Sequence, residues 1–233
     1  MSPDPDRPGP SDPKSAARRY SIFVGLAFLA LIVLATINTI NTASQSTLDA
    51  GSALPESAVP DATTGPLDAD ANVFQDDCET SEIPCPPDKR RASACQITAR
   101  GAIRVCDLFD RPLVISFWFM RFANCVPTQD VIDKVAGRYR GRVNFLSIDV
   151  RDNPQDVRTT VAEHNWSIPV GYDRDGAVSN LLRVSGCPTV DFVYPGGILA
   201  FSRQTVDQLS ADQLNADIRQ LLAASRRRAA RVQ

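Results

Sequence analysis

The 233-residue sequence contains a single histidine, His164, and no Cys-x-x-Cys motif. Zinc sites in proteins are built mainly from cysteine and histidine ligands, often paired at short spacing. With one histidine and no such pair, we expect neither a zinc nor a copper site, and no cofactor. The formal net charge of −2 is close to neutral, so the overall charge does not indicate a nucleic-acid partner.

Lysine and arginine are absent between Arg19 and Lys89, and residues 20–40 are mostly apolar and uncharged. About 20 such residues can cross a bilayer as a helix. The basic residues just before this run, with none for a long stretch after it, favour a cytoplasmic N-terminus. We therefore expect a disordered cytoplasmic tail at 1–19, a single transmembrane signal anchor at 20–40, and an extracytoplasmic C-terminal domain at the cell membrane.

A cleaved signal peptide is the alternative interpretation of the same run. Its apolar core is usually about 7–15 residues long and is followed by a small-residue cleavage site. Here the core is longer, and residues 38–43 make a poor site of that kind. A lipoprotein anchor is not expected, because no cysteine precedes Cys78. Both alternatives export the rest of the chain.

All six cysteines follow the apolar run, at positions 78, 85, 95, 106, 125 and 187. An even number of cysteines on the oxidising side of a membrane indicates disulfides. Residues 73–99 form a Cys/Pro-rich insertion with little apolar content, where disulfides could supply the missing constraint. The local pairings are Cys78 with Cys85 and Cys95 with Cys106, although four cysteines allow three connectivities.

Composition and periodicity divide the remaining chain. Residues 41–72 are small and polar and predict a flexible tether, within which residues 51–61 could supply a first edge strand. Residues 100–224 alternate between strand and helix patterns, which predicts an α/β fold, and 225–233 form a basic tail. The expected strands are 113–119, 143–150, 166–170, 189–194 and 198–202, and the expected helices are 126–139, 153–165, 177–184 and about 209–222.

Three motifs lie in order within this pattern: Phe117-Trp118, the segment 168–170 (Ile-Pro-Val), and the segment 186–189 (Gly-Cys-Pro-Thr). With them, residues 100–224 and the anchor resemble the TlpA/ResA-like (redoxin) group of tethered extracytoplasmic thioredoxin-like proteins. The resemblance implies a thioredoxin-like fold, in which a central mixed sheet is flanked by helices. It also implies a cis peptide bond before Pro188, in a loop that binds substrate backbone.

The family's Cys-x-x-Cys motif is degenerate here. Spacing from Trp118 places Phe122 at the first cysteine position and Cys125 at the second, while Arg121 replaces the usual preceding tryptophan. Asn124 suits the helix N-cap, so that Cys125 would lie at a helix N-terminus, where the helix dipole stabilises a thiolate. Burial behind Phe122 would favour the protonated thiol instead, and the sequence leaves this balance open.

The resemblance also places Cys187 close to Cys125, within reach of a disulfide if their Cα atoms lie within about 7 Å. Three alternatives remain open: a rearranged catalytic pair, an inert structural disulfide between the same two residues, or no such pair, with free thiols or with Cys187 bonded to the upstream cysteine segment. In the first, the protein is a thiol–disulfide oxidoreductase acting on exported protein thiols or disulfides, with a membrane electron donor as a further partner. The expected substrate-binding residues are Arg121, Phe122, Pro188 and Thr189.

Two other functions are weighed against the oxidoreductase. The first is a non-catalytic binding or assembly module of the cell envelope, in which Phe122 fills the vacated thiol pocket. The second is a thiol peroxidase, whose Thr-x-x-Cys motif would require threonine where Phe122 stands. Two polar residues are given structural roles: Asp149 is expected to cap a strand end, and His164 to be structural or solvated.

Overall fold

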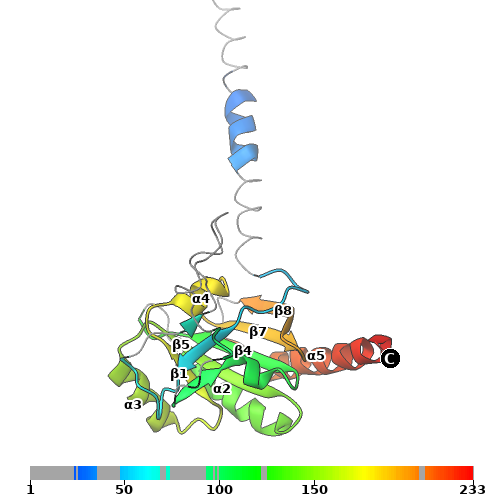
Figure 1. Ribbon diagram of the computed structural model, residues 1–233. Coiled ribbons are helices and arrows are strands. Elements are labelled where there is room, and N and C mark those ends of the chain that lie inside the picture. The colour runs from blue at the N-terminus through cyan, green and yellow to red at the C-terminus, as the bar shows by residue number, and fades with distance from the viewer. Residues whose placement is uncertain are drawn as a thin grey trace, which may run out of the picture. The chain divides into compact units, whose positions relative to one another are not determined.

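The computed structural model describes residues 24, 26–35, 48–68, 72–73, 93–96, 98, 100–121, 125–204 and 208–232. The chain divides into two units, residues 1–45 and 46–233. In the first unit, residues 26–35 are helical (Figure 1), and their large apolar side chains are exposed. Among the described residues, no helix is both long enough and apolar enough for a membrane span. The predicted tail, and residues 20–23, 25 and 36–40 of the predicted anchor, lie outside the described residues.

A five-stranded mixed sheet forms the centre of the second unit, in the order β6-β5-β4-β7-β8. Its strands are β4 (Leu113–Trp118), β5 (Asn144–Val150), β6 (Val170–Asp173), β7 (Thr189–Tyr194) and β8 (Ile198–Gln204). The first three are parallel, β7 pairs antiparallel with β4, and β8 pairs antiparallel with β7. Every residue of β4 is buried, as is typical of a central strand with both faces covered.

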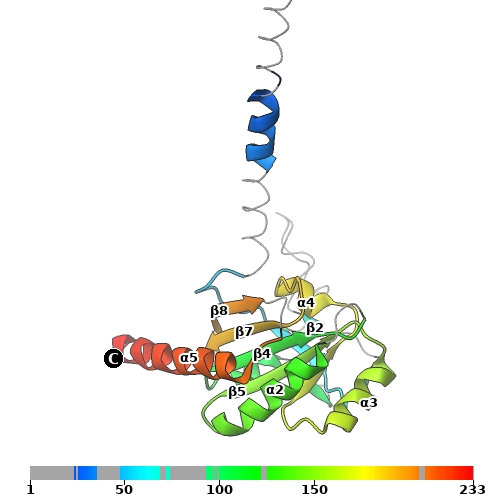
Figure 2. The ribbon, with the colours of Figure 1, turned by 180° about the vertical axis from the view of Figure 1, so that it is seen from behind.

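Helices cover both faces of this sheet. They are α2 (Val126–Ala136), α3 (Pro154–His164), α4 (Ala177–Leu181) and α5 (Ala211–Val232), with 3₁₀ turns η2 (Val105–Leu108) and η3 (Gly137–Tyr139). One face of β4 contributes Val114 to a core with α2 and α5, which lie together in front of the sheet in Figure 2. The opposite face contributes Leu113, Ile115 and Phe117 to a core that α4 and η2 complete.

A second, three-stranded antiparallel sheet has the order β2-β1-β3 and packs beside β6. Its strands are β1 (Ser57–Pro60), β2 (Asn72–Val73) and β3 (Ala102–Arg104). Residues 48–68 therefore belong to the folded domain rather than to the flexible tether expected at 41–72, and β1 lies within the segment 51–61 where a strand was expected. Although the 48–68 segment is polar overall, its sparse apolar residues are buried: Leu54, Val59, Ala62 and Leu67.

Two further elements differ from the prediction. The strand expected at 166–170 is instead β6, which begins at Val170 and ends at Asp173, so that Asp173 is buried at the end of a strand. The last helix continues through the basic segment to Val232, and its C-terminal end projects beyond the sheet (Figures 1 and 2). The other expected strands and helices are present, with ends that differ by up to three residues except at α5.

Candidate active site

Cys125 and Cys187 form a disulfide, with their Cα atoms 6.1 Å apart. This separation lies in the usual range for disulfides. Cys125 is the N-cap of α2 and is only 4% exposed, whereas Cys187 is half-buried. Cys187 precedes β7, and its peptide bond to Pro188 is cis, as the resemblance implied. The two sulfurs are therefore unequal: an attacking group from solvent meets Cys187 first.

The first turn of α2 is fixed to the sheet by a buried amide. Gln129 is fully buried, and its Oε1 accepts hydrogen bonds from Ser116 Oγ of β4 and Ser147 Oγ of β5, both 2.9 Å long. The backbone amides of Thr128 and Gln129 donate to the carbonyl of Cys125 and close the turn. Because two neighbouring strands hold one helix side chain, the position of Cys125 against the sheet is set by buried polar contacts.

The segment just before the Cys125 loop is held by Asp152. The Asp152 carboxylate accepts a hydrogen bond from the Met120 backbone amide at 2.5 Å and pairs with Arg121 Nε at 3.3 Å. Its side chain is 2% exposed, so this charge is almost wholly removed from water. On the other side, Cys187 Sγ lies 3.9 Å from the Phe119 carbonyl oxygen. Residues 119–121 therefore lie between the disulfide and a buried carboxylate.

Asp149 lies behind this segment and is completely buried. It is the register partner of Trp118 on β4, and its Oδ1 accepts a long hydrogen bond from the Asp152 amide. Burial, and secondarily the nearby charge of Asp152, raises the pKa of Asp149 to about 9. The expected capping contact is present, but the carboxyl is a neutral acid at pH 7 rather than a solvated charge. Among the described residues, neither Asp149 Oδ2 nor Trp118 Nε1 has a hydrogen-bond partner.

The predicted substrate-binding residues occupy different environments. Arg121 is exposed and lines two clefts, one of about 550 Å³ with Met120 and Asp152, and one of about 340 Å³ with Phe119. Pro188 and Thr189 are buried, and Thr189 Oγ1 donates to the Gly186 carbonyl. Phe122 lies outside the described residues, as does Asn124. Of the four, Arg121 alone is described with its side chain open to solvent.

The remaining cysteines form part of the domain's N-terminal region. Cys95 and Cys106 are joined in a disulfide, which is one of the two local pairings expected. Cys78 and Cys85 lie outside the described residues, as does most of the predicted insertion at 73–99. His164 has the structural role expected of it, because its Nδ1 lies 2.7 Å from Asp130 Oδ1 on α2.

Comparison with known proteins gives the fold a name. No protein-family profile matches the chain. The thiol-disulfide oxidoreductase ResA of Oceanobacillus iheyensis is 20% identical over 112 residues, which are 48% of this chain and 58% of that protein. The chain thus matches a little over half the length of this relative.

Two solved structures extend the comparison. A candidate thiol:disulfide interchange protein DsbE from Chlorobium tepidum is 17% identical with a TM-score of 0.54, covering 76% of this chain and 99% of its own. The thioredoxin domain of a thiol-disulfide oxidoreductase from Bacteroides vulgatus is 13% identical with a TM-score of 0.53 and the same two coverages. The chain has a thioredoxin-like fold. The fold implied by the sequence resemblance is thereby confirmed.

Sequence reasoning missed three features of the candidate active site: the burial of Gln129, the contacts of Asp152 and the burial of Asp149. Gln129 lies in a helix that also carries the exposed Asp130 and Lys134, so its type gives no sign of burial. Asp152 follows a strand and precedes a helix, which is an ordinary place for a loop acid. The only available signal was the position of Asp149 between Ile148 and Val150, in a strand that is mostly apolar.

Proposed function

We propose that the protein is a thiol–disulfide oxidoreductase whose redox centre is the Cys125–Cys187 pair. The observation that supports this most directly is the disulfide between a helix N-cap and the loop before β7 in a thioredoxin-like fold. A helix N-terminus stabilises a thiolate through its dipole and its free backbone amides. The pair would therefore replace the missing Cys-x-x-Cys, with one sulfur shielded and the other half-exposed.

Because Cys187 is more exposed than Cys125, the proposed reaction begins at Cys187. A substrate thiolate would attack Cys187 Sγ, the disulfide bond would break, and its electron pair would leave on Cys125 Sγ as a thiolate. A second substrate thiolate would then attack the substrate sulfur of this mixed disulfide and release Cys187 as a thiolate. The substrate gains a disulfide and the enzyme gains two protons from solvent. Reduction of a substrate follows the same steps in reverse, with Cys125 as resolving thiol.

The substrates we propose are thiols or disulfides of exported proteins, with a membrane electron donor for turnover. This follows from the proposed signal anchor at 20–40, which would place the domain outside the cytoplasm. The exposed apolar side chains of helical residues 26–35 support an anchor, since such a surface is costly in water. Protease digestion of intact spheroplasts tests the topology: the domain should be degraded without detergent, whereas protection would refute it.

A non-catalytic binding module is the second candidate, and the near-complete burial of Cys125 favours it. Graded reduction in dithiol buffers separates the two functions. A redox-active pair should open at a potential above about −300 mV, while structural disulfides typically have lower potentials. If thiol trapping shows Cys125 and Cys187 reduced only together with Cys95 and Cys106 below that value, the oxidoreductase proposal fails.

Single-cysteine variants test the direction of attack. Cys125→Ser leaves the half-exposed Cys187, whose thiolate should attack the disulfide of an oxidised peptide and accumulate as a mixed disulfide with it. Cys187→Ser leaves the buried Cys125 and should accumulate at least tenfold less. Cys95→Ser serves as the matched control, because it should leave trapping at the Cys125–Cys187 centre unchanged. Equal trapping by the first two variants would contradict the proposed order of attack.

A further inference from the structure

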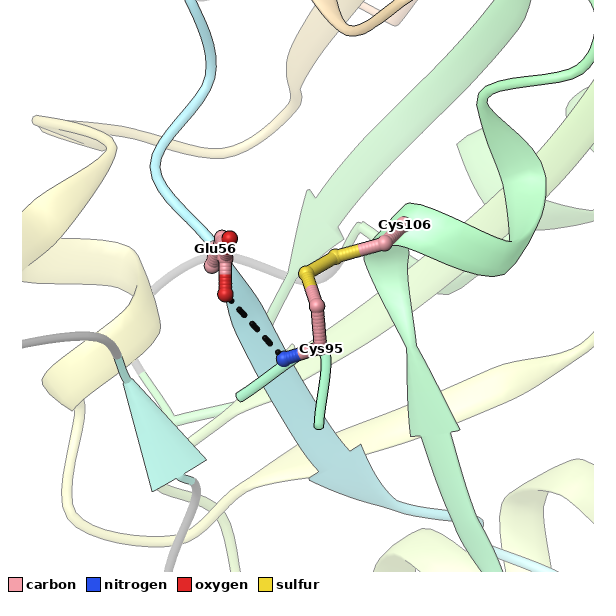
Figure 3. A group of neighbouring side chains, drawn as sticks. All are labelled: Glu56, Cys95 and Cys106. Carbon is pink, nitrogen blue, oxygen red and sulfur yellow. Dashed lines mark hydrogen bonds between the residues drawn. A yellow bond between two sulfur atoms is a disulfide. The ribbon is translucent and has the colours of Figure 1, made fainter. Parts of the chain in front are cut away.

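A second sulfur-containing group lies in the domain's N-terminal region, away from the sheet strands that carry the candidate active site. Cys95 Sγ, Cys106 Sγ and a carboxylate oxygen of Glu56 all lie within 4.8 Å of one another (Figure 3). The three residues come from different elements: Glu56 immediately precedes β1, Cys95 lies in a turn, and Cys106 lies in η2. All three are half-buried, so that the group is shielded yet reachable from solvent.

The backbone around the two sulfurs is held by contacts other than the disulfide. Glu56 Oε2 accepts hydrogen bonds from the Cys95 amide at 3.2 Å and from Ser93 Oγ. Arg104 Nη1 donates to the Cys95 carbonyl, and Arg104 also pairs with Asp107 of η2 at 2.8 Å. Because these bonds do not require the sulfur–sulfur bond, reduction would leave both thiols facing the same carboxylate.

The Glu56 carboxylate affects both the ionisation of the reduced pair and its affinity for cations. A negative charge this close to two sulfurs disfavours their thiolates by Coulomb repulsion. A divalent cation between the three groups reverses this effect, because it is attracted by every one of them. Zinc takes thiolate sulfur at about 2.3 Å and carboxylate oxygen at about 2.0–2.2 Å, and tetrahedral angles place two such sulfurs about 3.8 Å apart. That separation is compatible with the observed cluster.

We propose that reduction of the Cys95–Cys106 disulfide creates a zinc-binding site with Glu56 as third ligand and water in the fourth position. An external dithiol supplies two electrons and two protons, and is itself oxidised to a disulfide. The products are two thiols, and binding of Zn²⁺ releases their two protons to solvent. The oxidised form lacks thiolates and does not bind, so that zinc occupancy reports the redox state of this pair. This goes beyond the proposed oxidoreductase function and does not depend on it.

Metal titration of the full chain tests the proposal. The starting variant has serine in place of Cys78, Cys85, Cys125 and Cys187. Cys95 and Cys106 are then its only cysteines. Reduced under argon and titrated with Cd²⁺ as a spectroscopic substitute for zinc, it should bind one ion with a sulfur-to-metal charge-transfer band, and Zn²⁺ should displace it. Glu56→Gln should weaken binding at least tenfold, and the same protein with its disulfide intact should show no band.

A measurement on the unmutated chain keeps the proposal testable if the serine variant does not fold. After full reduction, Zn²⁺ should slow alkylation of Cys95 and Cys106 at least tenfold, as read by peptide mass spectrometry. Glu56→Gln should lose this protection, whereas Glu163→Gln, which alters an exposed acid on α3 outside the cluster, should keep it. Unchanged alkylation rates with Zn²⁺, or equal protection in Glu56→Gln, would overturn the proposal, as would equal Cd²⁺ binding by the oxidised protein.

Discussion

Substitution of Asp149 by asparagine should make the thioredoxin-like domain less sensitive to alkaline pH. Asp149 is wholly buried, and its pKa is raised from 3.8 to about 9, mainly by burial. The folded chain therefore keeps a proton that the unfolded chain has released above pH 3.8. Stability from this group is complete below the unfolded value and falls as pH rises toward the folded value. Asparagine has nearly the same shape and does not titrate.

The magnitude follows from linkage. Between the two pKa values, the free energy of unfolding of the natural protein should fall by about 1.4 kcal/mol for each pH unit, relative to the variant. From pH 5 to pH 8 the difference between the two proteins should therefore change by about 4 kcal/mol in favour of Asp149→Asn. Any fixed cost of the new amide, such as an unpaired N–H, is the same at every pH and cancels from this change.

Urea denaturation of both oxidised proteins, at pH 5, 6, 7 and 8, measures the effect directly. Asp212→Asn is the control, because Asp212 is exposed in the first turn of α5. Its difference from the natural protein should stay within about 0.5 kcal/mol at every pH. If the natural protein and Asp149→Asn lose stability in parallel as pH rises, Asp149 is ionised in the folded state and the reasoning is refuted.

Three further substitutions test the packing that positions the site, each by urea denaturation at pH 7. Gln129→Ala removes the shared acceptor of two buried serine hydroxyls and should cost about 2–3 kcal/mol; a cost below about 1 kcal/mol would mean that these hydroxyls find other partners. Gly171→Ala would place a Cβ 2.3 Å from Val59 Cγ2, so it should cost about 1–3 kcal/mol, and a neutral result would show that the β1 segment is free to move. Leu214→Ala, in the fully buried face of α5, should cost about 2–5 kcal/mol, whereas exposed Gln213→Ala should change stability little.

The central fold could be predicted because its signals are local and strong. The run at 113–118, apolar apart from Ser116, predicts a buried strand, and the apolar face of the helix after Cys125 predicts its packing. These signals need no knowledge of distant neighbours, and the five-stranded sheet agrees with them. The approach of Cys187 to Cys125 was implied instead by the family resemblance, and the disulfide between these two residues agrees with it.

The elements that sequence reasoning missed depend on neighbours far along the chain. Residues 48–68 have the composition of a linker, yet Val59 becomes buried because Gly171 of β6 leaves room for its side chain. Asp173 lies beyond the strand expected at 166–170, yet it is buried at the end of β6 and accepts backbone hydrogen bonds from α4. A polar residue buried by a distant partner has no signature of its own in a single sequence.

The spacing of the two site cysteines links the redox state of this pair to the thermodynamic stability of the domain. The Cys125–Cys187 bridge spans 62 residues, a segment that includes β5, α3, β6 and α4. In the chain-entropy description, closing such a loop stabilises the fold by about 4 kcal/mol, against about 2 kcal/mol for the four-residue loop of a Cys-x-x-Cys pair. Reduction of this bridge should therefore lower the free energy of unfolding by about 4 kcal/mol, about twice the loss expected for a Cys-x-x-Cys protein. A partner that captures the unfolded chain would distinguish the two redox states without touching either sulfur.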